Sequence, residues 1–293
     1  MVDITAPEGT WSFDLETVRI VPSVPSRGRE SSKLRYELGE LAIPLMAVAS
    51  IGYEPGRKGG RIRLRLRNGA DPFVQATAGR LSDASDPYQL PVGPARAAEA
   101  AHFVHEVRDS LLVWQVPDGP TDRYLLPGPD VPLTAAAGDG IATFDGSHIR
   151  LEWNLMAEDA KKSAGPRQFA LHELTGAEWH PQVGLGYGYL RFRLNDGVTD
   201  RAAEHDPNCL AWGIRKEGGT TALVAAAVLA RLPHPSRARD EPPASTGEPS
   251  TAAADDPDTL LRRLRELGEL HRDGTLTDEE FSAAKQALLQ RLS

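Results

Sequence analysis

The sequence predicts an α+β protein in which two tandem modules, each a bent antiparallel sheet closed by a C-terminal helix, precede a C-terminal α-helical hairpin. Three observations predict it: sequence blocks recur in both halves, strand patterns give way to one helical pattern in each half, and leucine stripes stand near the C-terminus. The predicted segments are a first repeat at 1–112, an inter-repeat connection at 113–139, a second repeat at 140–232, a disordered linker at 233–257 and the hairpin at 258–293.

The repeat rests on four blocks that keep one order along the chain. The matched pairs are 11–20 with 143–151, 41–48 with 169–177, 61–68 with 189–195, and 86–90 with 206–210. Chance similarity does not keep such an order, whereas duplication followed by deletions in loops does. The sequence therefore predicts that both halves share one fold.

Each copy is expected to begin with strands and to end with a helix. Ile62, Leu64 and Leu66 alternate with arginines, which is the period-two pattern of a half-buried antiparallel strand. A turn signal, Asn68-Gly69, follows at once. Small and apolar residues then recur at helical spacing over 97–111, and residues 220–232 of the second copy are almost wholly apolar or small. This layout resembles the pleckstrin-homology-like (PH-like) barrel.

Two helices are predicted after a linker rich in Pro, Ala, Ser and Thr. Asp258 is placed to cap the first helix and Gly274 to end it, and a capping box at 277–280 opens the second. A hairpin of about 35 residues is too small to bury its apolar stripe alone, so it needs a partner. The stripe consists of Leu260, Leu264, Leu267, Leu270, Phe281 and Leu288.

The residues of this tail resemble the SHOCT (short C-terminal) domain, through the run from Gly274 to Phe281 with Leu264, Leu267 and Leu288. The two copies before it, which open on 9–14 and 139–145, resemble an uncharacterised actinobacterial family that carries this repeat in tandem. That resemblance implies no reaction and no ligand. The SHOCT resemblance implies oligomerisation, so the expected partner is a second protein or another copy of this chain.

An arginine strand is the candidate anion-binding surface. Its residues, all expected on one side of a strand or just before it, are Arg57, Lys58, Arg61, Arg63, Arg65 and Arg67. Such a stripe suits phosphates, anionic lipid headgroups or an acidic protein surface, and so predicts at most weak contact with a membrane surface. The favoured alternative is a solvated face whose arginines pair with acidic residues on the next strand. No aromatic residues interleave with the arginines and no segment is basic overall, so nucleic acid is not an expected partner.

Other chemistry-bearing residues predict structure more readily than catalysis. Gly184, Gly186 and Gly188 precede a strand instead of a helix, which disfavours a dinucleotide site. His102 and His105 share a helix face but lack a third metal ligand. Cys209, the single cysteine, is expected to be a structural residue. No catalytic residue, metal or cofactor is therefore predicted.

Composition agrees with a protein that binds or assembles. The net charge is −8, one cysteine excludes an internal disulfide, and no apolar run is long enough to span a membrane. No secretory signal opens the sequence, so a cytoplasmic location is expected. The function predicted is a non-enzymatic interaction or scaffold protein whose hairpin oligomerises or docks a partner. Peripheral anion or lipid binding is the alternative, and an enzyme with a pocket between the repeats is least favoured.

Overall fold

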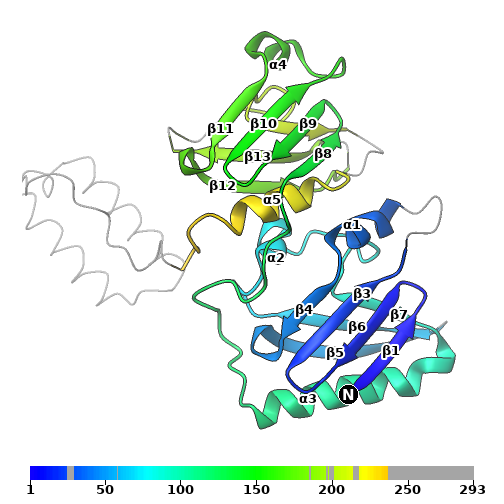
Figure 1. Cartoon of the computed structure of the whole chain (residues 1–293). Coiled ribbons are helices and arrows are strands. Elements are labelled where there is room, and N and C mark those ends of the chain that lie inside the picture. The colour runs from blue at the N-terminus through cyan, green and yellow to red at the C-terminus, as the bar shows by residue number, and fades with distance from the viewer. Residues whose placement is uncertain are drawn as a thin grey trace, which may run out of the picture. The chain divides into compact units, whose positions relative to one another are not determined.

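The structure of the protein, a computed structural model, describes most of the chain up to residue 236 (Figure 1). The described residues are 1–24, 30–57, 59–184, 186–195, 197, 201–213 and 218–236. They belong to the first of two compact units, Met1–Asp240. The predicted hairpin, with its leucine stripe, and most of the predicted linker lie outside the described residues.

The first copy consists of two antiparallel sheets and a closing helix. One sheet has four strands in the order β1-β2-β3-β4, and the other has three in the order β5-β6-β7. The strands are β1 (Val2–Ala6), β2 (Gly9–Phe13), β3 (Thr17–Pro22), β4 (Leu41–Pro44), β5 (Val48–Gly56), β6 (Gly59–Leu66) and β7 (Gln89–Val92). Helix α3 (Ala97–Val113) follows and packs on β1, β5 and β6.

Alternation of side chains along each strand builds the core of this copy. Trp11 and Phe13 on β2 are buried, as are Val18 and Ile20 on the neighbouring β3, while the residues between them are not. In α3 the buried residues, such as Phe103, recur at helical spacing and turn toward the sheets. One apolar face on each element is thus removed from water.

The second copy repeats the same order of elements. A four-stranded sheet, β11-β10-β9-β8, is followed by a three-stranded sheet, β12-β13-β14. The strands are β8 (Leu133–Ala137), β9 (Gly140–Phe144), β10 (His148–Trp153), β11 (Arg167–Ala170), β12 (Leu174–His180), β13 (Gly188–Leu194) and β14 (Cys209–Trp212). Helix α5 (Thr221–Leu229) closes this copy. The predicted α+β class with antiparallel sheets is confirmed.

Several elements were not predicted from the sequence. Strand β8 lies inside the segment 113–139 predicted as a connection, where it pairs with β9, so the second copy begins earlier than predicted. Each copy also carries a helix between its third and fourth strands. The helices at this position are α1 (Glu30–Leu38) and α4 (Asp159–Ala164). Outside it lie α2 (Pro72–Thr77), between β6 and β7, and the 3-10 turns η1 (Leu45–Ala47), η2 (Pro94–Arg96) and η3 (Leu171–Glu173).

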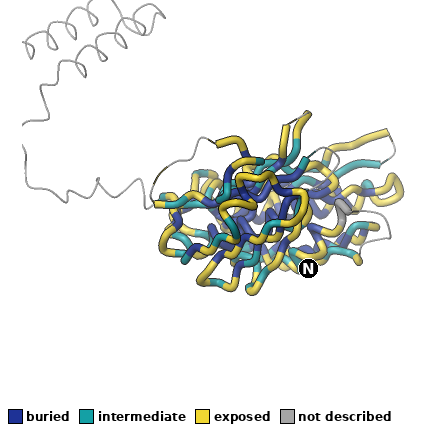
Figure 2. The backbone as a smooth tube through the Cα atoms, turned by 90° about the horizontal axis from the view of Figure 1, so that it is seen from above, coloured by how far each residue is buried: buried dark blue, intermediate teal, exposed yellow. Residues whose placement is uncertain are grey.

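Helix α5 joins the two copies. All nine of its residues are buried, because it packs on β8, β9 and β12 of its own copy and on α2 of the first copy. A helix that is apolar all round is stable only when it is covered on every side. One continuous cluster of buried side chains consequently runs through both copies. In the backbone trace of Figure 2, the buried segments lie toward the interior of the described part of the chain.

Polar contacts support this junction. The Arg80 guanidinium of the first copy lies 2.8 Å from His180 Nε2 at the end of β12. Burial, and next the charge of Arg80, lower the pKa of His180, which favours a neutral ring that accepts a hydrogen bond from the guanidinium. The start of the predicted linker is also packed: His234 is 8% exposed, and its Nε2 lies 3.0 Å from the Gly69 carbonyl.

Candidate functional site

Strand β6 carries the predicted arginine strand, and its first two arginines are engaged with acidic neighbours. Arg61 forms an ion pair with Asp83 and donates to Gln89 Oε1 at 2.8 Å. Arg63 lies 3.6 Å from Glu54 Oε1 on β5 and 3.7 Å from Asp83 Oδ1. The hydrogen bond with Asp83 raises the pKa of Arg61, and the same bond lowers the pKa of Asp83.

The other four basic residues of the predicted anion-binding surface differ in their surroundings. Arg67 donates to the carbonyls of Met46 at 2.9 Å and Gly119 at 2.8 Å, which ties the end of β6 to the inter-repeat connection. Arg57 and Arg65 are exposed, and neither has an ion pair with any residue that the structure describes. Lys58 lies outside the described residues. Arg65 also borders a cavity.

This cavity, here called the Arg65 cavity, has a volume of about 250 Å³ and lies where β6 passes α2 and the segment before β7. Its apolar wall is made of five side chains: Leu64, Leu66, Phe73, Val74 and Leu81. Its other lining residues are Arg65, Thr77, Gly79, Asp86 and Tyr88. The site therefore combines an apolar wall with one exposed guanidinium.

Asp71 and Tyr88 form a buried hydrogen bond next to the Arg65 cavity. The Asp71 carboxylate caps α2 by accepting from the Phe73 and Val74 amides, both at 3.0 Å, and it accepts from the Tyr88 hydroxyl at 2.5 Å. Burial raises the pKa of Asp71, and the three hydrogen bonds only partly offset it. Burial also raises the pKa of Tyr88 well above its usual range. Both groups are thus committed to holding α2 on the sheet.

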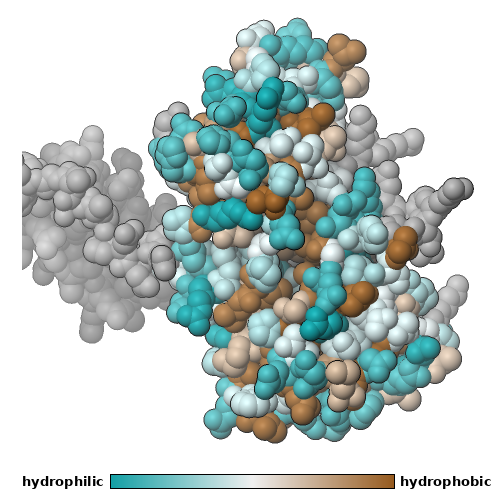
Figure 3. All heavy atoms as spheres, in the orientation of Figure 1, coloured by the Kyte–Doolittle hydropathy of each residue, from teal (hydrophilic) through white to brown (hydrophobic). Residues whose placement is uncertain are grey.

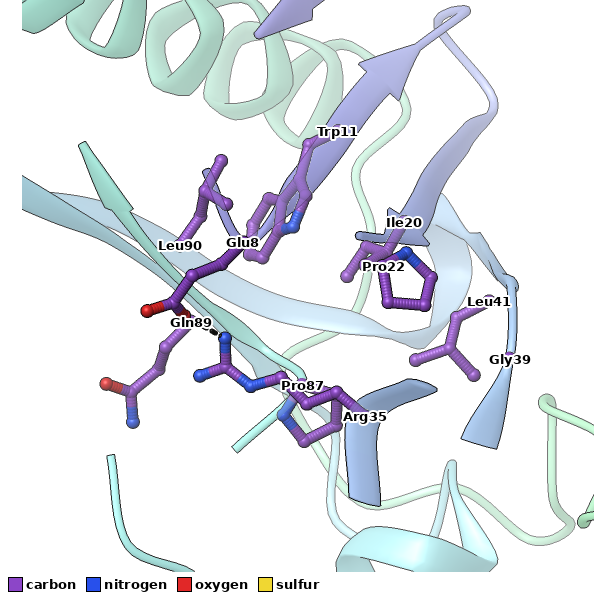
Figure 4. A pocket seen from close by; sticks show the side chains of 10 residues that line it. All are labelled: Glu8, Trp11, Ile20, Pro22, Arg35, Gly39, Leu41, Pro87, Gln89 and Leu90. Atoms are coloured by element: carbon purple, nitrogen blue, oxygen red, sulfur yellow. Dashed lines mark hydrogen bonds and ion pairs between the residues drawn. The ribbon is translucent and has the colours of Figure 1, made fainter. Parts of the chain in front are cut away.

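An ion pair connects α1 to the β1–β2 turn in the first copy (Figure 4). Arg35 on α1 is 6% exposed, pairs with Glu8 in the β1–β2 turn, and donates to the Asp83 carbonyl at 2.8 Å. The view shows the guanidinium pointing toward the Glu8 carboxylate. The space left among these side chains is only about 10 Å³, too little for a ligand.

The second copy has an equivalent ion pair. Lys161 on α4 is 0% exposed, and its Nζ lies 2.5 Å from Asp139 Oδ2 in the β8–β9 turn and 2.7 Å from the Cys209 carbonyl. Asp139 Oδ1 also accepts from the Ala211 amide at 2.9 Å. Burial raises the pKa of Asp139, and Lys161 only partly offsets this effect. In both copies, a basic residue on the helix between the third and fourth strands forms an ion pair with an acidic residue in the turn between the first two strands.

Sequence reasoning missed this pair of ion pairs. A signal was present, because an acid–glycine dipeptide, Glu8-Gly9 or Asp139-Gly140, opens the second strand of each copy. The basic partners stand on short helices that show no clear apolar period, so nothing local marked them as buried.

Cys209 is buried at 0% exposure, and burial raises the pKa of its thiol to about 12. The thiol therefore stays protonated near neutral pH and is a poor nucleophile. The second copy also has a cavity of about 250 Å³, whose lining includes the carboxylates Asp139, Glu158 and Glu204 but not Cys209.

The histidine pair and the glycine run do not form sites in the described part of the chain. His102 and His105 are exposed on α3 and face Glu106 at 3.9 Å and Asp109 at 3.2 Å, respectively. Among the described residues, no group of three or more His, Cys, Asp or Glu side chains is arranged to hold a metal ion. Strand β13, not a helix, follows the glycine run.

Comparison with known families places both halves of the chain. The profile described as "Domain of unknown function (DUF4429)" matches residues 11–108 and 142–229. The chain belongs to the DUF4429 family. Its two matched segments confirm the predicted tandem repeat, and a match to the "Short C-terminal domain" (SHOCT) at 262–289 confirms the resemblance of the tail.

No curated protein matches this DUF4429 chain. None of the helices within the described ranges is long and apolar enough to cross a membrane. On the face seen in Figure 3, hydrophobic residues are scattered among hydrophilic ones over the described part of the chain.

Proposed function

We propose that this DUF4429 protein is a non-enzymatic interaction or scaffold protein. One observation carries the proposal: the buried carboxylates with shifted pKa values in the described residues, Asp71 and Asp139, are engaged in contacts that hold the fold. Asp71 caps α2, Asp139 pairs with Lys161, and the Cys209 thiol stays protonated. Acid–base and nucleophilic catalysis need groups that meet a substrate. The least favoured alternative, an enzyme with a pocket between the repeats, receives no support from these contacts.

We place the interaction in the tail, and its leucine stripe mediates self-association or partner docking. The support is the SHOCT match at 262–289 and the apolar period of Leu260, Leu264, Leu267 and Leu270. A stripe of this kind needs a covering surface, because a short hairpin buries too little apolar area alone. We further propose that each module is PH-like, which the order of four strands, three strands and a closing helix supports.

The location proposed is the cytoplasm, and the origin proposed is actinobacterial, as the resemblance of the tandem repeats implies. The alternative function is peripheral binding of anionic lipid or of a phosphate-bearing ligand through the arginine strand, and among the described residues it would rest on the exposed Arg57 and Arg65. Arg61 and Arg63 already face Asp83, and a cation paired in this way attracts a further anion less strongly.

The tail proposal predicts a change of mass when the stripe is broken. In the full chain, Leu264→Glu with Leu267→Glu places two charges on the stripe, so we expect an assembly to dissociate to the monomer. Light scattering coupled to gel filtration, at about 1–100 µM protein, measures the mass. A matched control, Ala254→Glu with Thr251→Glu in the linker, is expected to keep the assembly. Self-association is wrong if the unmodified chain is monomeric throughout, or if the stripe and linker variants have the same mass.

A further inference from the structure

Five of the ten residues that line the Arg65 cavity have apolar side chains, and its two hydroxyl groups are already hydrogen-bonded. The Tyr88 hydroxyl already donates to Asp71 at 2.5 Å, and the Thr77 hydroxyl donates to the Phe73 carbonyl at 2.9 Å. Leu64, Leu66, Phe73, Val74 and Leu81 supply the aliphatic and aromatic part of the lining. Against these side chains a polar ligand group would lose its water without gaining a hydrogen bond, so this part of the cavity favours an apolar group.

The lining of the cavity carries two charged side chains, the Arg65 guanidinium and the Asp86 carboxylate, and only the guanidinium attracts an anion. Arg65 is exposed and forms no ion pair with any described residue, whereas Asp86 is already engaged. Its carboxylate accepts from the Tyr88 amide at 3.0 Å and from Gln89 Nε2 at 2.7 Å. A guanidinium binds a carboxylate through two parallel hydrogen bonds, which gives both orientation and strength.

The second copy provides an internal comparison. Leu64 and Arg65 face β5 beside a register shift, as Phe192 and Arg193 face β12 beside an equivalent shift, so Arg193 is the counterpart of Arg65. Arg193 forms an ion pair with Glu178. The available guanidinium is therefore a property of the first copy, and Arg193 offers a matched control.

We propose that the Arg65 cavity binds a small amphipathic carboxylate, with its apolar chain against Leu66, Phe73 and Leu81 and its carboxylate on Arg65. A cavity of about 250 Å³ is near the lower end of the sizes of small-ligand pockets, so we expect a ligand of roughly eight to twelve non-hydrogen atoms. Octanoate falls in this range. For so small a ligand we expect a Kd of roughly 0.01–1 mM.

This site is separate from the role proposed for the tail. It limits the anion-binding alternative to one class of ligand, a carboxylate with an apolar chain. The two sources of such a carboxylate, a free fatty acid and a membrane surface, share the headgroup but differ in presentation. A cavity with one guanidinium beside it accepts a single free molecule, whereas a flat arginine surface prefers many headgroups held in one plane.

The test is calorimetric titration of the full chain with octanoate, below the concentration at which octanoate forms micelles. We expect saturable binding of one octanoate per chain, weakened about tenfold or more by Arg65→Gln and unchanged by Arg193→Gln. Filling the cavity with Leu81→Phe is expected to abolish binding. Octanol, which has the same chain without charge, is expected to bind Arg65→Gln as well as it binds the unmodified protein. Thermal unfolding of each variant establishes that it is folded.

Three results would overturn the proposal: no saturable binding up to several millimolar octanoate, equal weakening by Arg65→Gln and Arg193→Gln, or unchanged binding to a folded Leu81→Phe variant. A vesicle arm separates the two sources. Sedimentation with vesicles of phosphatidylserine and phosphatidylcholine that depends on Arg57 and Arg65, without octanoate binding, would replace the cavity ligand with a lipid surface. Failure here differs from failure of the tail proposal, because the variant with Leu264→Glu and Leu267→Glu is expected to bind octanoate normally.

Discussion

Substituting Ala226→Asp in α5 is expected to destabilise both copies together, by about 4 kcal/mol or more. Ala226 is 0% exposed on a helix that is buried along its whole length, so the new carboxylate would lose its hydration without gaining a partner. The free energy of unfolding from urea titration measures the loss. Ala98→Asp, on the exposed side of α3, makes the same change in a solvated place and is expected to alter stability by less than about 0.5 kcal/mol.

The extent of that loss distinguishes a shared core from two independent ones. Because α5 packs on α2 of the first copy, we expect amide exchange to accelerate in β2 and β3 of the first copy as well as in β8 and β9. If exchange accelerates only in the second copy, the junction does not couple the two modules.

Removing the buried cation, with Lys161→Ala, is expected to cost about 3 kcal/mol of the free energy of unfolding at neutral pH. The substitution leaves Asp139 buried without its ion-pair partner and frees the Cys209 carbonyl. Arg150→Ala removes a cation from the pair with Glu152, whose side chains are 58% and 47% exposed, and is expected to cost less than about 1 kcal/mol. Equal costs for the two variants would show that the buried pair is not special.

The cost of Lys161→Ala is also expected to depend on pH. Burial already raises the pKa of Asp139, and loss of Lys161 raises it further. A carboxyl group whose folded pKa is raised contributes stability below its unfolded pKa, near 3.9, and loses it as the pH rises through the folded value. The difference between the variant and the unmodified protein should therefore be smaller near pH 4 than near pH 7. A difference that does not change over this range would contradict the assignment to Asp139.

The sequence predicts those features that repeat along the chain or show a period. The alternation of Ile62 and Leu64 with arginines places β6 correctly, and the helical spacing over 97–111 marks α3. Helix α2 is missed because six residues are too short to show a period, although Asp71-Pro72 is a good start signal. Strand β8 is missed because its match in the first copy, β1, precedes the first recurring block.

The candidate site depends on contacts that no local pattern contains. The expected partner for the arginines was an acid on the next strand, and Glu54 on β5 fits this expectation through Arg63. Asp83, which contacts both Arg61 and Arg63, comes instead from the segment between α2 and β7. That segment brings Asp83 to Arg61 and Arg63 but not to Arg65, so Arg65 forms no ion pair with a described residue. The course of the segment cannot be inferred from the order of the residues alone.

Two copies of one module share a single core through α5 and α2. Differential scanning calorimetry of the full chain tests it most directly, by comparing the calorimetric enthalpy of unfolding of the body with the van't Hoff enthalpy from the same transition. The shared core predicts one transition for both copies, with a ratio of the two enthalpies near one. Two resolved transitions, each with about half of the total enthalpy, would contradict it.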